Sequence, residues 1–138
     1  MALVLLVDDD QEPMLYYVMA LKQEGFDVQQ ITGPDQALLY ICDQNNRRPD
    51  IIIMDSMLPP GSYAQNPECD QGLRTGVLLY PELKKHCTDI PFLVLTNLKR
   101  AAKDFKTIAP DVPVLQKIDT PPFDLVSSIK RILSKRMK

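Results

Sequence analysis

The sequence predicts an α/β fold in which five parallel strands form a doubly wound sheet in the order 2-1-3-4-5. Short apolar runs alternate with helical patterns along the 138 residues. A run that is apolar at every position indicates a strand buried on both faces, and helices between such strands supply the crossovers that a parallel sheet needs. Polar side chains follow the ends of several runs. The length fits one domain, spanning residues 1–138.

The predicted strands are short and bounded by polar or turn-forming residues. Three aspartates follow the first strand, and Pro49 and Pro91 shortly precede the third and fourth. The predicted ranges are Leu3–Val7, Phe26–Ile31, Ile51–Met54, Phe92–Leu95 and Val112–Leu115.

Helical spacing of apolar residues fills the intervals between the strands. Pro13 suits the first turn of the first helix and Gly25 its end, and Pro34 opens a second helix that runs to about Asp43. The apolar positions that predict the last two helices are Leu98, Ala101, Ala102, Phe105 and Ile108, then Phe123, Val126, Ile129 and Leu133.

One long connection, at about residues 56–75, shows no clear periodicity. Connections of this length are uncommon in compact domains and are often functional. It is either a tolerated surface insertion or a lid or partner-selecting element, with Tyr63 and Arg74 as its contacts. Pro81 then falls within the third helical pattern, so that helix either kinks there or begins at Pro81.

Composition is that of a soluble protein, with 45% hydrophobic and 25% charged residues. The apolar run Met1–Val7 is too short for a signal peptide or a membrane span. Three cysteines without a C-x-x-C pair predict reduced thiols in a cytoplasmic protein. His86 beside Cys87 is weak evidence for zinc, because no second pair of candidate ligands accompanies it.

Charge is distributed unevenly along the chain. Residues 1–98 carry 14 acids and 6 bases, whereas residues 99–138 carry 4 acids and 10 bases. The basic region is either a set of solvated helix faces or a docking surface for an acidic partner. Nucleic acid is a weaker alternative, because few aromatic residues lie among the bases.

Four groups of polar residues follow the predicted strands. Asp8, Asp9 and Asp10 follow the first strand and Asp55 the third. Thr96 follows the fourth strand and Lys117 the fifth. Ligands of open α/β sheets bind beyond these strand ends, and the first and third strands are neighbours in this order. The carboxylates are therefore expected to share a pocket, where a divalent cation such as Mg²⁺ would relieve their repulsion and Lys117 and Thr96 would complete a phosphoryl site.

The strings LVLLVDDD, PDIIIMDSMLP, PFLVLTN and PVLQK resemble the motifs of response-regulator receiver domains over essentially the whole chain. The resemblance implies the flavodoxin-like (βα)5 receiver fold. It also implies a single receiver domain of a two-component phosphorelay that is a phosphoacceptor rather than an enzyme.

By this resemblance, Asp55 is the phosphoacceptor. Asp8, Asp9, Asp55 and the main-chain carbonyl of Met57 would bind Mg²⁺, with Asp9 a direct ligand and Asp8 acting mainly through a bound water. Lys117 would bind the phosphoryl oxygens and Thr96 would shift towards them.

The implied partners are a sensor histidine kinase or phosphotransfer protein as donor, and a downstream protein that binds the fourth helix, fifth strand and fifth helix. Neither a DNA-binding domain nor a membrane segment is expected.

Three positions depart from the receiver pattern. Ile118 replaces the proline that usually follows the lysine, which predicts a trans Lys117–Ile118 bond or a strained one. Val114 stands where an aromatic switch residue is common, and Asn97 where a small residue is usual.

Two alternative functions remain. A receiver-like binding module that is not phosphorylated would account for these departures. A phosphatase of the haloacid dehalogenase type fits the Asp8-x-Asp10 pattern but leaves Asp55 without a role.

Overall fold

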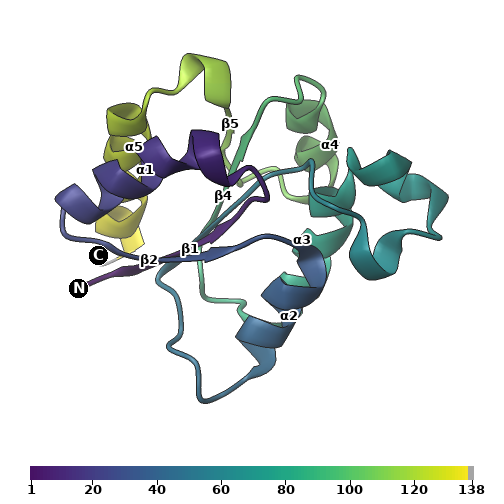
Figure 1. Ribbon diagram of the computed structural model, residues 1–138, viewed down its shortest axis with the longest axis horizontal. Coiled ribbons are helices and arrows are strands. Elements are labelled where there is room, and N and C mark those ends of the chain that lie inside the picture. The colour runs from purple at the N-terminus through teal and green to yellow at the C-terminus, as the bar shows by residue number, and fades with distance from the viewer. Residues whose placement is uncertain (137–138) are drawn as a thin grey trace.

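The computed structural model describes residues 1–136, and its strands form one parallel sheet in the order β2-β1-β3-β4-β5 (Figure 1). The doubly wound α/β prediction is therefore confirmed, strand order included. The strands are β1 (Leu3–Val7), β2 (Asp27–Ile31), β3 (Ile51–Met54), β4 (Phe92–Thr96) and β5 (Val114–Gln116).

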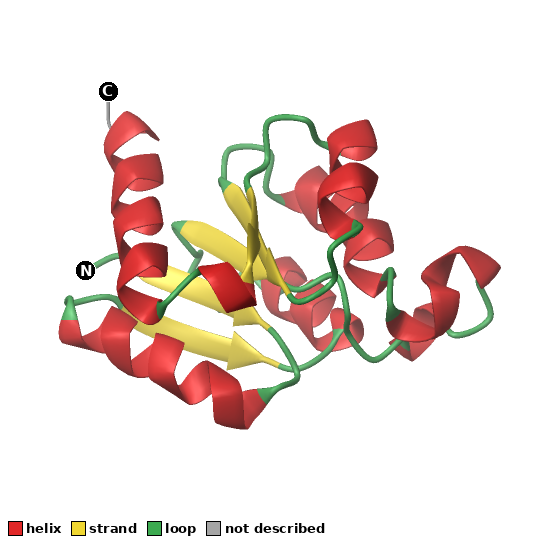
Figure 2. Ribbon diagram, turned by 90° about the horizontal axis from the view of Figure 1, so that it is seen from above, coloured by secondary structure: helices red, strands yellow, loops and turns green. Residues whose placement is uncertain are grey.

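Five α-helices connect and follow the strands and cover both faces of the sheet (Figure 2). Helices α1 and α5 pack against one face, and α2, α3 and α4 cover the other. Their bounds are α1 (Gln11–Gln23), α2 (Pro34–Cys42), α3 (Thr75–His86), α4 (Ala101–Ile108) and α5 (Pro122–Arg136).

The core has two layers because successive strand residues point to opposite faces. Leu5 and Ile52 belong to the layer beneath α2, α3 and α4, whereas Leu6 and Ile53 belong to the layer beneath α1 and α5. All four side chains are fully buried. Burial on both faces explains why these strands are apolar at every position.

The edge strand β2 is the most polar strand, with Gln29 exposed and Gln30 half-buried. No described helix is long and apolar enough to cross a membrane.

The structure corrects several predicted boundaries. Strand β2 begins at Asp27 rather than Phe26, and β4 ends at Thr96 rather than Leu95. Strand β5 begins at Val114 rather than Val112, because the N–H of Val112 donates to Ala109 in a turn (3.0 Å). Helix α3 begins at Thr75 and continues through Pro81, so a start at Pro81 is wrong. The first turns of α3 bury Val77, among other residues, and this burial outweighs the hydrogen bond that proline removes.

The chain between β3 and α3 contains two short 3₁₀ helices, η1 (Gly61–Tyr63) and η2 (Pro67–Gly72). We call residues 56–74 the β3–α3 segment. A third 3₁₀ turn, η3 (Lys117–Asp119), connects β5 to α5.

Candidate functional site

Asp8 and Asp55 lie side by side at the carboxyl edge of the sheet. Strands β1 and β3 are neighbours with Val7 opposite Met54, so the residue after each strand emerges at the same level. The N–H of Asp55 donates to the carbonyl of Val7 (3.1 Å). Both aspartates are buried, with 1% of Asp8 and 3% of Asp55 exposed. The strand pairing thus brings two carboxylates together away from water.

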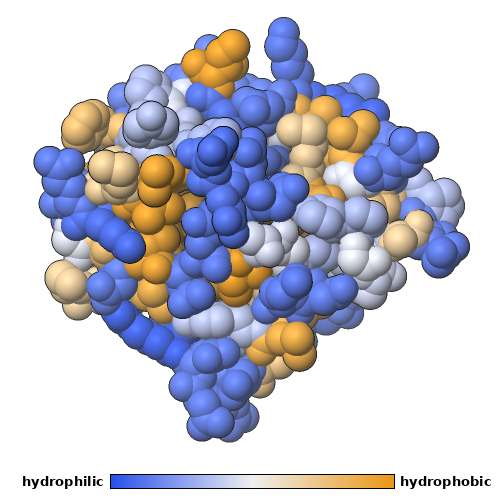
Figure 3. All heavy atoms as spheres, in the orientation of Figure 1, coloured by the Kyte–Doolittle hydropathy of each residue, from blue (hydrophilic) through white to orange (hydrophobic). Residues whose placement is uncertain are grey.

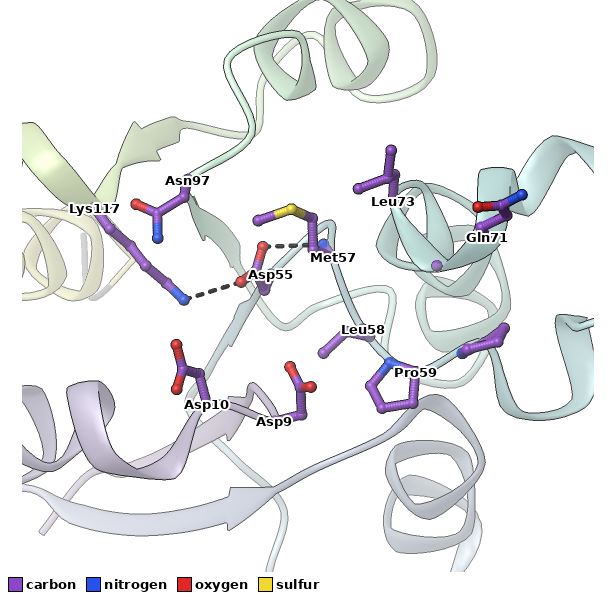
Figure 4. A pocket seen from close by; sticks show the side chains of 12 residues that line it. Asp9, Asp10, Asp55, Met57, Leu58, Pro59, Gln71, Leu73, Asn97 and Lys117 are labelled. Carbon is purple, nitrogen blue, oxygen red and sulfur yellow. Dashed lines mark hydrogen bonds and ion pairs between the residues drawn. The ribbon is translucent and has the colours of Figure 1, made fainter.

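Lys117 bridges these two carboxylates. Its Nζ lies 2.8 Å from Asp8 Oδ2 and 3.0 Å from Asp55 Oδ2 (Figure 4 shows the contact with Asp55). The lysine follows β5 at the far side of the sheet, and only 9% of its side chain is exposed. A lone cation thus offsets part of the charge of two buried anions, and the remaining negative charge favours a further cation.

Backbone N–H groups hold the second oxygen of each carboxylate. The N–H of Met57 donates to Asp55 Oδ1 (3.0 Å), and the N–H of Asp10 donates to Asp8 Oδ1 (2.9 Å). Each aspartate therefore bonds the residue two positions later, which fixes its side chain without help from a ligand.

Burial governs the protonation of this group. It raises the pKa of Asp8 to about 6, although hydrogen bonds from Lys117 and Asp10 act in the opposite direction. Burial alone would lower the pKa of Lys117, but the charges of Asp55 and Asp8 and their hydrogen bonds outweigh it and raise that pKa. The raised pKa keeps Lys117 protonated, and the charge of Asp8 changes near pH 6.

A cavity of about 420 Å³ opens above Asp55 and Lys117. Asp9 and Asp10 line it from the start of α1, and the exposed Asn97 lines it from the end of β4 (Figure 4). The other lining residues are Met57, Leu58, Pro59, Pro60, Gln71, Gly72 and Leu73. The cavity leads from solvent to the carboxylate of Asp55.

The oxygen donors of this site suit a hard divalent cation in type and charge. Asp9 and Asp55 line the same cavity, and Asp8 contacts the same lysine as Asp55. As they stand, no three described His, Cys, Asp or Glu side chains are close enough to enclose a metal ion. A bound cation would therefore require some of these side chains to move closer together.

Thr96 is not among the residues that line this cavity. It ends β4 fully buried, and its hydroxyl accepts a hydrogen bond from the N–H of Leu98 (3.2 Å). Gln116 donates to the carbonyl of Leu98 (3.2 Å), which ties β5 to the same turn. Thr96 is thus linked to the chain that enters α4.

The Lys117–Ile118 peptide bond is trans, as predicted from the missing proline. Lys117 nevertheless reaches both carboxylates, and the exposed Ile118 side chain points into solvent.

Sequence reasoning missed Gly76, which lies in the first turn of α3. A Cβ atom on Gly76 would lie 2.3 Å from the carbonyl oxygen of Asp55 and 2.8 Å from Cα of Ser56. Because both contacts are with backbone, only glycine allows α3 to pack against the chain at Asp55. The signal was the glycine directly after Thr75, at the start of a helical pattern.

Comparison with solved structures identifies the fold. A CheY-like receiver domain protein from Methanospirillum hungatei JF-1 is 20% identical with a TM-score of 0.76, and the match covers 99% of this chain and 97% of that one. The receiver domain of the Francisella response regulator 1452 is 23% identical with a TM-score of 0.72 and full coverage of both chains. This chain has the fold of a response-regulator receiver domain. No family model and no curated protein matches its sequence.

A third receiver structure carries a modification. A response regulator from Burkholderia pseudomallei, solved with a phosphorylated aspartic acid, a calcium ion and citrate, is 21% identical with a TM-score of 0.64. That match covers 85% of this chain and 60% of the Burkholderia protein. The receiver fold of this chain extends over its described length, with the β3–α3 segment built into it.

Proposed function

We propose that this receiver domain stores a signal as a phosphoryl group on Asp55, and that it acts as a phosphoacceptor rather than as an enzyme. The main observation that supports this proposal is the position of Asp55. Its carboxylate lies at the floor of a cavity open to solvent and contacts Lys117, a buried cation able to bind phosphoryl oxygens. The phosphorylated aspartic acid of the Burkholderia regulator, which shares the fold, supports the same role.

We further propose that phosphorylation requires Mg²⁺. Asp8, Asp9, Asp55 and the main-chain carbonyl of Met57 would hold the ion. When bound, it would supply positive charge against the phosphoryl oxygens. The excess of carboxylates over cations at this edge of the sheet supports the proposal.

In this mechanism an oxygen of Asp55 attacks phosphorus in line with the bond that breaks. The N–H of Met57 orients the carboxylate through Oδ1 and leaves lone pairs on both oxygens for the attack. Lys117, which now donates to Asp55 Oδ2, would transfer that hydrogen bond to the new phosphoryl group. Thr96 would turn its hydroxyl from Leu98 towards the same group.

The donor in this proposal is a phosphohistidine on a sensor histidine kinase or phosphotransfer protein in the cytoplasm, where cysteine thiols stay reduced. The output is contact with another protein through α4, β5 and α5. Thr96, Leu98 and Gln116 link the site to that face by hydrogen bonds. Basic side chains are exposed near it on α4, including Lys103 and Lys106.

Intact mass after incubation with phosphoramidate and Mg²⁺ tests the proposal. Wild type is expected to gain the mass of one phosphoryl group, and Asp55→Asn none. Asp43→Asn, which changes an exposed aspartate after α2, is the control and should gain the group as wild type does.

A binding module that is not phosphorylated is the second candidate, because Lys117 already closes the gap between Asp8 and Asp55. It predicts no mass gain in any variant. Loss of uptake in Asp8→Asn with Asp55→Asn unaffected would instead indicate the phosphatase alternative.

A further inference from the structure

The β3–α3 segment forms one wall of the cavity above Asp55. Pro59, Pro60, Gln71 and Leu73 line it from this segment, and none of them carries a charge. Figure 4 shows Leu73 across the cavity from Lys117. The cavity therefore has a charged side, from the sheet and α1, and an uncharged side that carries an exposed leucine (37%).

Hydrogen bonds to the chain around Asp55 hold this wall. Ser56, the residue after the phosphoacceptor, donates its hydroxyl to the carbonyl of Leu73 (2.8 Å). The N–H of Leu58 donates to the carbonyl of Gly72 (3.1 Å), and the hydroxyl of Thr75 donates to the carbonyl of Leu58 (2.8 Å). The position of Leu73 is thus fixed relative to Asp55.

The backbone of the wall is strained at two residues. Asp70 and Gln71 have φ values of 53° and 55°, a left-handed conformation that non-glycine residues rarely adopt. Ion pairs anchor the outer side of the wall to α4, between Arg100 and Asp70 and between Arg74 and Asp104 (3.3 Å). Strain that the surrounding contacts maintain is concentrated at functional sites in proteins.

We propose that Leu73 contacts the leaving group of the phosphodonor, so that the site favours an N-phosphoimidazole over a donor without a ring. This inference rests on the proposed function. In an in-line transfer the leaving group lies opposite the attacking oxygen, and Asp55 attacks from the cavity floor. The leaving group therefore occupies the open side of the cavity, where Leu73 offers an apolar surface to an aromatic ring.

The transfer balances without a further reactant. The bond between an Asp55 oxygen and phosphorus forms as the phosphorus–nitrogen bond breaks. The imidazole ring, protonated on its other nitrogen, leaves as neutral imidazole with the electron pair of the broken bond. Phosphoramidate reacts in the same way and releases ammonia, which has no surface for Leu73 to contact.

Rate constants for phosphorylation by monophosphoimidazole and by phosphoramidate, measured by intact mass with Mg²⁺, test the inference in wild type and Leu73→Ala. The ratio of the two rate constants should fall by about tenfold in Leu73→Ala, the low end of the effect of losing an apolar contact in a pocket, because Leu73 is partly exposed. Leu39→Ala is the matched control, since it truncates a leucine that is exposed on α2 and absent from the cavity lining.

A ratio within twofold of wild type, or an equal loss of rate with both donors, would overturn the role of Leu73. Thermal unfolding of each variant detects a folding defect, and Leu73→Met, which keeps an apolar side chain of similar volume, should retain the wild-type ratio. Failure of the proposed function gives a different result, because wild type would then gain no phosphoryl group from either donor.

Discussion

The ammonium group of Lys117 lies 3.0 Å from Asp55 Oδ2, in a position where fewer than a tenth of either side chain is exposed. The same ammonium group contacts Asp8 at 2.8 Å, so one cation serves two buried anions. Removal of the Lys117 charge should therefore lower the free energy of unfolding.

Lys117→Met should lower the free energy of unfolding by about 3 kcal/mol in metal-free buffer, because it leaves two buried carboxylates without their partner. Urea denaturation measures this loss, and Mg²⁺ should restore part of it. Lys130→Met is the control, since Lys130 pairs with Glu24 at the surface. Equal effects of the two substitutions would contradict the prediction.

Stability should depend on pH through Asp8. Burial raises its pKa from 3.8 to about 6 in the folded state. Between about pH 4 and about pH 6, Asp8 is therefore protonated in the folded chain and ionised in the unfolded chain. The free energy of unfolding should therefore decrease over that range, by on the order of 2 kcal/mol.

Urea denaturation of wild type and Asp8→Asn between pH 4 and pH 7 tests this effect, because titrating groups that do not interact with Asp8 contribute equally to both. The difference between the two proteins should change across this interval in metal-free buffer. A constant difference would show that Asp8 does not titrate there.

Gly76→Ala should both destabilise the protein and slow phosphorylation. Its Cβ atom would meet the backbone of Asp55 and Ser56, so either α3 or Asp55 must move. A loss of about 1–3 kcal/mol is expected for such overpacking. Gly33→Ala is the control, because its Cβ atom would meet only the flexible side chain of Gln36. Phosphorylation of the Gly76→Ala variant at the wild-type rate would contradict this packing argument.

The ion pair between Arg74 and Asp104 should stabilise the attachment of the β3–α3 segment to α4. Its side chains are 29% and 18% exposed, so a double-mutant cycle with Arg74→Ala and Asp104→Asn should give a coupling energy of about 0.5–1 kcal/mol. The pair between Lys85 and Glu82, which is 68% and 45% exposed, should give almost none. Similar coupling energies in the two pairs would show that burial does not strengthen the Arg74–Asp104 pair.

The central strands β1, β3 and β4 were predictable because burial on both faces leaves a continuous apolar run, as at Ile51–Met54. The positions of Asp8, Asp55 and Lys117 followed, since residues after parallel strands meet at one edge of the sheet. The start of α3 was not predictable from Pro81, because burial of the preceding turns decides it.

The contacts between distant residues were also beyond sequence reasoning. The sequence does not indicate that Leu73 lines the cavity, because the position of Leu73 depends on the fold of the whole β3–α3 segment. Nor does periodicity show that Lys117 bridges Asp8 and Asp55 rather than facing them across a gap. Both facts depend on the path of a loop or the rotamer of a long side chain.

The β3–α3 segment is attached to elements on both sides of it. Ser62 donates its hydroxyl to Asp35 on α2 (2.7 Å), while Asp70 and Arg74 pair with Arg100 and Asp104 at α4. A chimera that transplants this segment onto another scaffold would therefore need matching recipient residues on two separate helices. Without them, the grafted segment would keep its sequence but would not adopt the same conformation.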